Sequence, residues 1–179
     1  TVVFVHHNAQ KIRNKHTRFV PLDDYVPVLK DIIADETITK ESSHLVYLSM
    51  SESRKTIDSN IMYSILRKRP KRADTYWFVH VHILDQPYTK SFHVDTIVPN
   101  RIFFVQLKFG FKVQHRVNAM FHEIVDQMVA SGEIDIRSPY PSIRKHNMEA
   151  DFKFILLQIN ITNISKVNAN RPFIVEFFV

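Results

Sequence analysis

The 179-residue sequence contains no cysteine. This absence excludes disulfide bonds, zinc sites built on thiolates and cysteine nucleophiles, and it is typical of proteins from a reducing compartment. Glycine is almost as scarce, because only Gly110 and Gly132 occur. Phosphate-binding loops of the Walker and GxGxxG kinds need several glycines, since the backbone must approach the phosphate closely. The sequence therefore excludes the common nucleotide-binding enzymes.

Long hydrophobic runs and targeting signals are also missing. No apolar segment reaches the roughly 20 residues that a membrane-spanning helix needs, and the first ten residues lack the features of a signal peptide. The composition is that of a packed protein, with 45% hydrophobic residues and 14 phenylalanines. The net charge of +6 favours anionic neighbours, such as nucleic acid, a phosphate ligand or a membrane surface. We expect one soluble folded domain.

Hydrophobic periodicity predicts alternating strands and helices. Residues 44–50 and 75–84 have the β-branched and aromatic composition of buried strands. Between them, residues 53–68 carry an apolar stripe with a period of about 3.6 residues, and Pro70 ends this helix. A strand, a helix and a strand at this spacing predict a βαβ unit whose two strands are parallel.

Further elements are expected along the rest of the chain. Residues 21–36 predict a short helix capped by Asp23, and residues 117–131 predict a helix that stops at Gly132. Other strands are predicted at residues 91–98, 101–113 and 151–159, with a hairpin turn at Pro99-Asn100 and a polar loop at residues 135–150. Residues 172–179 are expected to form a last apolar strand or a packing arm. The predicted fold is mixed α/β (α+β), with a central mixed β-sheet that contains the βαβ unit and is covered by two to four helices.

Histidines cluster on two predicted strands. His80 and His82 are two residues apart, so both side chains lie on one face, and His93 and Asp95 have the same spacing on the strand that is expected to pair with theirs. Imidazole and carboxylate groups on adjacent strands suit a zinc or nickel site, whereas the simpler alternative is a polar sheet face near the rim. GxSxG and HExxH motifs are absent. We predict no metal, no cofactor and no enzyme, with His80, His82 and His93 as the candidate ligands should a metal bind.

The densest charge lies in the segment 67–72, RKRPKR. Its cations are Arg67, Lys68, Arg69, Lys71 and Arg72. Cations at a helix C-terminus have an ordinary structural reason, because the last carbonyls carry partial negative charge. Functional alternatives are a juxtamembrane role and the binding of a phosphate ligand, with Tyr76 and Trp77 as candidates to stack on the base of such a ligand. Nucleic-acid binding through Arg67–Arg72 is the runner-up hypothesis, although the segment lacks helix-turn-helix spacing and an RRM-type aromatic pair.

Five segments stand in an order that resembles a known family. They are KIRNKHTRFVPLDDYVPVLKDI, HLVYLSM, IMYSILRKRPKRADTYWFVHVHILDQPYT, DTIVPNRIFFVQLKFGFKVQHRVN and DFKFILLQI, which together cover roughly residues 10–160. Within them, ILDQP resembles an Asp-x-Pro strand end, KFGFK an aromatic-Gly-aromatic element and HRVN a Val-Asn helix opening. The collinear set resembles the C-terminal cytoplasmic region of Kup-type potassium uptake permeases.

The resemblance implies a non-catalytic regulatory and assembly domain of a proton-coupled potassium uptake transporter, on the cytoplasmic side of the cell membrane. Its partner would be the transmembrane part of the same permease. The family's ion-binding residues lie in that part, so none can be assigned to this sequence. Some bacterial relatives respond to cyclic di-AMP, which makes this dianionic dinucleotide a candidate ligand of the segment 67–72.

The resemblance also implies how the chain is organised. Residues 1–20 would be a basic juxtamembrane segment that follows the last membrane helix, and residues 21–179 would be a single cytoplasmic domain. The cations expected to face anionic lipid are Lys11, Arg13, Lys15 and Arg18.

The number of phenylalanines exceeds what one small core needs, which predicts a homodimer that buries some of them. The residues concerned are Phe103, Phe104, Phe109, Phe111, Phe154, Phe173, Phe177 and Phe178.

Overall fold

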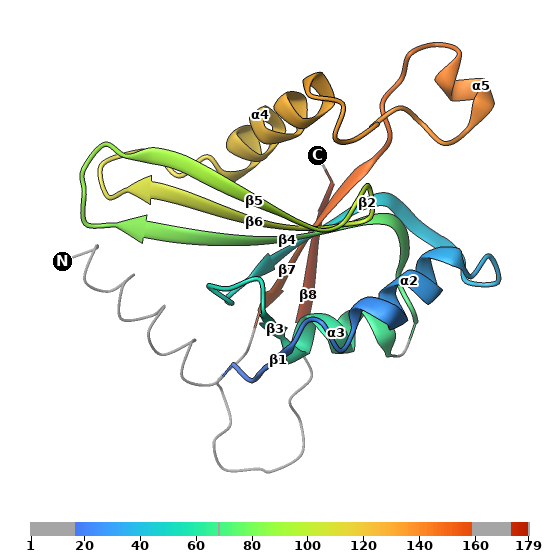
Figure 1. The fold of residues 1–179 in the computed structure, drawn as a ribbon, viewed down its shortest axis with the longest axis horizontal. Coiled ribbons are helices and arrows are strands. Elements are labelled where there is room, and N and C mark those ends of the chain that lie inside the picture. Colours follow the sequence, from blue (N-terminus) through green and yellow to red (C-terminus); the bar gives the residue numbers. More distant parts are fainter. Residues whose placement is uncertain (1–16, 68, 159–172, 179) are drawn as a thin grey trace.

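The computed structural model of the chain describes residues 17–67, 69–158 and 173–178. Its elements are β1 (Phe19–Pro21), α2 (Val26–Ala34), β2 (Lys40–Ser49), β3 (Thr56–Asp58), α3 (Ser59–Leu66), β4 (Arg72–Leu84), β5 (Lys90–Val98), β6 (Ile102–Gly110), α4 (Val117–Ala130), α5 (Pro141–Arg144), β7 (Phe152–Gln158) and β8 (Phe173–Phe178) (Figure 1).

A six-stranded mixed sheet forms the centre of the fold, in the order β5-β6-β4-β2-β7-β8. Its four inner strands are parallel to one another, and the edge strands β5 and β8 are antiparallel to their neighbours. Inner parallel strands are covered on both faces, which explains why β4 and β6 are almost continuously apolar. The predicted mixed α/β architecture is confirmed.

The predicted βαβ unit is formed by β2, α3 and β4. The two strands are parallel in a register that runs from Ser42 opposite Ala73 to Ser49 opposite His80. α3 ends at Leu66, ahead of Pro70, because proline restricts the residue before it to extended geometry. The predicted hairpin at Pro99-Asn100 is also present, where it joins β5 to β6.

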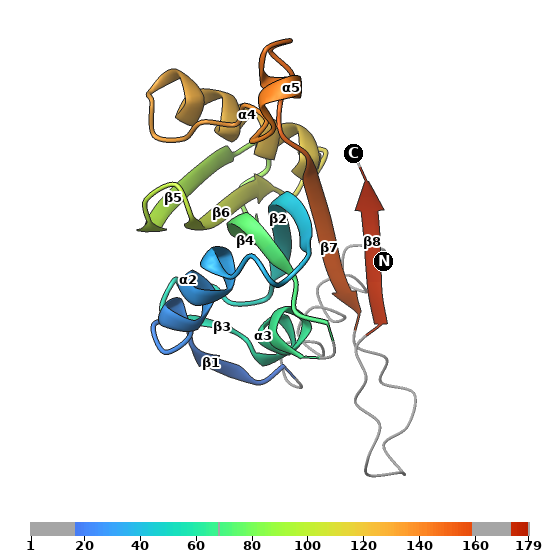
Figure 2. The same cartoon turned by 90° about the vertical axis from the view of Figure 1, so that its right-hand side faces the viewer.

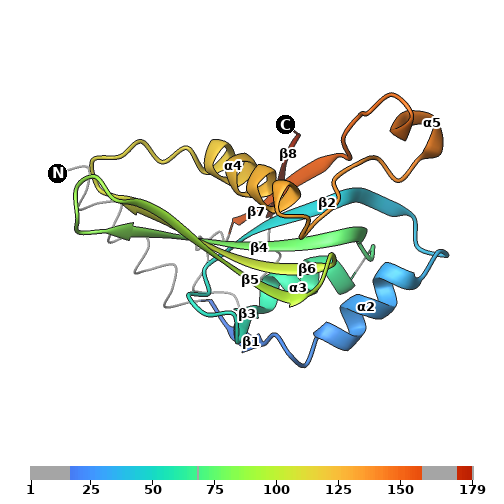
Figure 3. The same ribbon diagram turned by 45° about the horizontal axis from the view of Figure 1, so that its top comes forward.

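Helices cover both faces of the sheet. Figure 2 and Figure 3 show α2 and α3 on one face and α4 on the other. Successive residues of a strand point to opposite faces, so each inner strand supplies two cores. The α2/α3 core contains Tyr47, Phe78 and Phe104, and the α4 core contains their neighbours Val46, Trp77 and Phe103.

These two cores correct the argument that linked phenylalanine content to a dimer. Phe103, Phe104, Phe109 and Phe154 are all buried within the monomer. A sheet that is covered on both faces simply needs more large apolar side chains than one core does. Phe111 is exposed. Phe173, Phe177 and Phe178 belong to β8, whose side chains lie outside the described part of the structure.

Three local features differ from the sequence-based expectation. α2 begins at an N-cap formed by Tyr25, with no side-chain cap, so Asp23 is not the cap. The loop at residues 135–150 contains the short helix α5. The small ribbon of β1 and β3 was not predicted, and its register places Phe19 opposite Asp58. Folded structure therefore extends into the segment 1–20.

The two glycines give a matched test of backbone packing. A Cβ atom added to Gly110, at the end of β6, would lie 2.4 Å from the Gln86 carbonyl oxygen and 2.6 Å from Pro87. At Gly132, which follows α4 with φ of 77°, an added Cβ meets nothing within 4 Å.

We expect Gly110→Ala to lower the free energy of unfolding by about 2 kcal/mol, since the backbone must move to accommodate the methyl group. Gly132→Ala should lower it by about 1 kcal/mol, the cost of a left-handed conformation for a residue with a Cβ atom. Urea unfolding of the two variants measures both values. A larger loss at Gly132 than at Gly110 would contradict the packing that the structure gives.

Candidate functional site

The segment 67–72 lies between the end of α3 and the start of β4. Arg67 is the C-cap of α3, and its amide donates to the Tyr63 carbonyl at 2.9 Å. Arg67 and Arg69 are exposed, and Lys68 lies outside the described residues. These cations therefore stand beside the partial negative charge of a helix C-terminus, as the structural alternative expects.

The last two residues of this segment take part in internal contacts, Lys71 through its backbone and Arg72 through its side chain. The Arg72 guanidinium donates to the carbonyl oxygens of Ile33 at 3.1 Å and of Ile38 at 3.5 Å, so it satisfies acceptors at and beyond the end of α2. The Lys71 carbonyl accepts a hydrogen bond from the Tyr76 hydroxyl at 2.6 Å. Arg72 thus joins α2 to β4. Among the described cations of the segment, Arg67 and Arg69 are the more exposed.

Tyr76 and Trp77 are not available for stacking on a ligand. Both side chains are 0% exposed, one in each of the two cores. Trp77 stacks on Phe103 with ring centroids 4.4 Å apart, and its indole nitrogen donates to His44 Nδ1 at 3.3 Å. The prediction that Tyr76 and Trp77 stack on a bound ligand is therefore wrong, because both faces of β4 are covered.

The histidines form part of a polar row across the sheet. Ser49, His80, Gln106 and His93 occupy directly opposite positions on β2, β4, β6 and β5. Directly opposite residues share a face, and this row continues the α2/α3 face beyond its apolar core. Gln106 donates to the Glu52 carbonyl at 2.7 Å, so the loop that follows β2 contacts the row.

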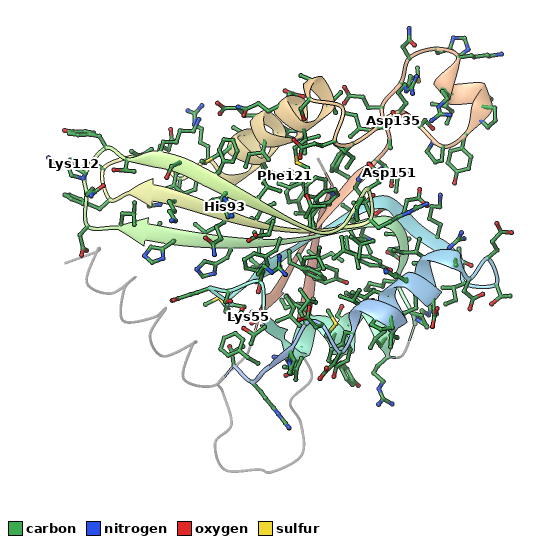
Figure 4. The ribbon with its side chains drawn as sticks, viewed as in Figure 1. Lys55, His93, Lys112, Phe121, Asp135 and Asp151 are labelled. Atoms are coloured by element: carbon green, nitrogen blue, oxygen red, sulfur yellow. The ribbon has the colours of Figure 1, made fainter. Side chains whose placement is uncertain are left out.

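This arrangement corrects the expected pairing of the histidine strands. β6 lies between β4 and β5, so His93 is opposite Gln106 rather than His80 (His93 is labelled on β5 in Figure 4). The His93 ring instead lies 3.4 Å from Asp95 on its own strand, and His82 lies opposite Lys108. Within the described parts of the chain, no group of three or more possible ligands could hold a metal ion.

A buried polar cluster lies where β2 ends. Asp58 is buried, and its carboxylate accepts hydrogen bonds from the Ser49 hydroxyl at 2.6 Å and the Met50 amide at 3.0 Å. Burial raises the pKa of Asp58, although both hydrogen bonds favour its ionised form. Burial also lowers the pKa of His80, whose Nδ1 lies 3.2 Å from the Ser49 carbonyl oxygen.

The same cluster does not have the geometry of a Ser-His-Asp triad. The Ser49 hydroxyl donates to Asp58, whereas His80 contacts the Ser49 backbone rather than its hydroxyl. A triad needs the imidazole between the hydroxyl and the carboxylate. The cluster instead fixes the turn after β2. Sequence reasoning did not identify it, although an aspartate directly before a helix, after the serine-rich segment SMSES, is a usable signal.

Ion pairs surround the starts of the inner strands. The Lys40 ammonium lies 2.8 Å from the Asp74 carboxylate, and Lys153 pairs with Glu41. The hydrogen bond from Lys153 lowers the pKa of Glu41. Of the cations expected to face lipid, Arg18 is exposed beside β1, while Lys11, Arg13 and Lys15 lie outside the described residues.

Comparison with known proteins identifies the family. A family model described as "K+ potassium transporter C-terminal domain" matches residues 42–178. The chain belongs to this potassium transporter C-terminal domain family. The match runs from the third residue of β2 to the end of β8, so it reaches every strand of the central sheet. The resemblance found in the sequence is thereby confirmed.

Three curated relatives of this potassium transporter C-terminal domain are much longer than the chain. Each is named a probable potassium transport system protein Kup: one from Cytophaga hutchinsonii is 34% identical over 99% of the chain, one from Flavobacterium psychrophilum is 37% identical over 99%, and one from Clostridium perfringens is 35% identical over 98%. The chain spans only 27% of the length of each relative.

Comparison with solved structures found no match to this domain. In the part of the chain that the structure describes, no helix has both the length and the hydropathy to cross a bilayer.

Proposed function

We propose that the chain is a cytoplasmic, non-catalytic regulatory and assembly domain of a proton-coupled potassium uptake transporter, joined to a transmembrane part of the same polypeptide. One observation carries the proposal. Relatives named for potassium transport match almost all of this chain but are nearly four times as long, with 27% of their length covered. The remaining length of such a protein would carry the ion pathway.

Potassium uptake by the complete protein tests this role. The whole reading frame that encodes the chain is expressed in a bacterial strain that lacks its own uptake systems, with and without residues 42–178. We expect the complete protein to restore growth and rubidium uptake at low potassium, and the truncated protein to lose regulation or assembly of the transporter. A reading frame without a polytopic hydrophobic part, or a complete protein that does not transport, would refute the proposal.

The proposed cytoplasmic location has a separate test, because the chain contains no cysteine. Lys30 is exposed on α2, so Lys30→Cys introduces a reactive thiol without disturbing a core. A membrane-impermeant maleimide should label this variant only after the cells are permeabilised. The protein without the substitution controls for thiols elsewhere. Labelling of intact cells would place the domain on the opposite side.

A regulatory ligand is proposed for the segment 67–72, in the class of phosphate-bearing dinucleotides such as cyclic di-AMP. Arg67 and Arg69 are exposed neighbours, and guanidinium groups bind phosphate oxygens through paired hydrogen bonds. Since Tyr76 and Trp77 are buried, the proposal depends on charge alone. Lys71 and Arg72 would contribute electrostatically while retaining their internal contacts.

Calorimetry with cyclic di-AMP provides the measurement for this ligand. We expect the double variant Arg67→Gln/Arg69→Gln to lose at least tenfold in affinity, since each charged hydrogen bond contributes about 1.5–3 kcal/mol. The matched control is Arg54→Gln/Lys55→Gln, which removes two exposed cations from the loop after β2. A flat titration of the unmodified chain at high micromolar ligand would eliminate the ligand, and equal losses in both variants would eliminate the site.

We also propose that the domain forms a homodimer and that residues 1–20 lie against anionic lipid. Exposed apolar side chains on the outer sides of α2 and α3, namely Val28 and Tyr63, support a contact with a second copy. Light scattering at tens of micromolar should give the mass of a dimer. A strict monomer at that concentration would remove this part of the proposal.

A further inference from the structure

The carboxyl ends of β4 and β6 form a compact projection at one end of the sheet. We call it the aromatic tip and define it as residues 85–89 and 111–116. Figure 4 shows Lys112 at the far end of the β4–β6 sheet, and Figure 1 shows α2 and α5 toward the opposite end. The helices α2 and α5 therefore lie away from the tip, whereas residues 111–116 lead directly into α4.

Backbone hydrogen bonds hold the two segments of the aromatic tip together. The Phe111 amide donates to the Gln86 carbonyl at 3.2 Å, and the Lys112 amide donates to the Pro87 carbonyl at 3.0 Å. Gly110 allows this close approach, because a Cβ atom there would collide with the same backbone. The side chains of the tip thus project from a fixed backbone, which lowers the entropy lost when they bind a surface.

Two exposed aromatic rings of the tip lie near one lysine. Tyr88 is 73% exposed and Phe111 is 45% exposed. The Lys112 ammonium lies 5.6 Å from the centre of the Tyr88 ring and 5.9 Å from the centre of the Phe111 ring. Exposed aromatic rings beside a cation are typical of the membrane interface, where rings occupy the headgroup level and cations contact lipid phosphate.

Cations outnumber acidic residues at the tip and on the strand residues that adjoin it. Residues 85–92 and 108–116 contain four cations, Lys90, Lys108, Lys112 and Arg116, and one acidic residue, Asp85. Their net charge of four minus one, or +3, is half of the +6 carried by the entire chain. Lys90 is paired with Glu123 of α4 at 2.7 Å, which still leaves a cationic surface. This charge complements an anionic bilayer.

We propose that the aromatic tip docks on the anionic lipid surface of the bilayer, with Tyr88 and Phe111 in the headgroup layer and Lys112 against lipid phosphate. The inference rests on the proposed function in one respect, namely that the domain operates beside a membrane. A protruding tip fits a headgroup layer better than it fits nucleic acid, since single-stranded nucleic acid is bound along grooves and open sheet faces. It adds a second lipid contact to the basic segment 1–20.

Vesicle co-sedimentation of the 179-residue chain tests the inference. We expect binding to vesicles of phosphatidylcholine mixed with phosphatidylglycerol and little binding to phosphatidylcholine alone. Lys112→Glu should weaken binding about 25-fold, since a cation near the surface contributes roughly fivefold and the reversal changes two charges. Tyr88→Ser/Phe111→Ser should weaken binding by about tenfold or more, because less apolar surface enters the interface. Each variant is compared by circular dichroism to establish that it is folded.

The matched control pair lies at the other end of the molecule. Tyr140 and Ile143, near and within α5, are 53% and 38% exposed, so Tyr140→Ser/Ile143→Ser removes similar apolar side chains. This pair should bind vesicles as the unmodified chain does. Equal weakening in both pairs, or no preference of the unmodified chain for anionic vesicles, would overturn the inference.

Binding of the tip to nucleic acid or to a second copy of the chain would give different results from lipid docking. A tip that binds random duplex DNA but not vesicles would be a nucleic-acid site, and a dimer that dissociates in Tyr88→Ser/Phe111→Ser would make the tip a contact between copies. Either result would refute lipid docking. None of these results depends on potassium uptake, so a failure here is distinct from a failure of the uptake experiment.

Discussion

Replacing Trp77 with alanine is expected to lower the free energy of unfolding by about 4 kcal/mol, the range found for large aromatic side chains removed from a core. The indole stacks on Phe103 and meets Phe121 edge-on, with ring centroids 5.2 Å apart. It also donates to His44 Nδ1, which would lose a buried hydrogen-bond partner. Denaturant unfolding followed by far-UV circular dichroism measures the loss.

Tyr88→Ala is the control for this prediction. Tyr88 is 73% exposed, and its removal should change the free energy of unfolding by less than about 1 kcal/mol. If Trp77 instead formed part of a ligand surface, Trp77→Ala would resemble this control in stability. A loss below about 1 kcal/mol would therefore contradict the buried position of the indole.

Acid is expected to destabilise the domain through His44. Burial lowers the pKa of His44 from its ordinary value of 6.5 to about 4, against the attraction of Asp74 and Asp151, which raises it. The unfolded chain takes up a proton as the pH falls below 6.5, whereas the folded protein does so only near pH 4. The contribution of neutral His44 to the free energy of unfolding is therefore complete above pH 6.5. It is lost as the pH falls from 6.5 to about 4. The shift corresponds to a loss of about 3 kcal/mol.

The measurement is the free energy of unfolding from pH 7.5 to pH 4, with and without His44→Asn. Asparagine places an oxygen where Nδ1 accepts the Trp77 hydrogen bond, but it does not titrate. The variant should have lower stability at neutral pH, because it loses stacking on Phe152, and a shallower dependence on pH. An unchanged slope in His44→Asn would contradict the prediction.

Much of the central sheet could be predicted from periodicity. The strand at residues 75–84 and the helix before it have unambiguous patterns, and a helical crossover between two strands indicates their parallel pairing. The Pro99-Asn100 turn similarly identifies the β5–β6 hairpin, with Asn100 at a φ of 60°. These features depend on neighbouring residues in the sequence, which is why the sequence predicts them.

The site was predicted less well, because its properties depend on which elements meet. A strand of continuous apolar residues does not tell whether its aromatics are covered, and only the position of α4 shows that Trp77 is buried. The order of strands is also non-local, so the sequence could not place β6 between His80 and His93. The aromatic tip depends on the contact between residues 85–89 and Phe111, which no local pattern encodes.

The pairing of β2 with β7 has a consequence for biosynthesis. Ser43 and Asp151, which are joined by a hydrogen bond at the start of this pair, lie 108 positions apart. At about 5–20 residues per second, a ribosome needs roughly 5–20 s to produce the second partner after the first. For that time one edge of β2 has no neighbour, and an unpaired apolar edge promotes aggregation. Slow translation or depletion of chaperones should therefore reduce the yield of this domain, whereas sequence changes confined to exposed loops should not.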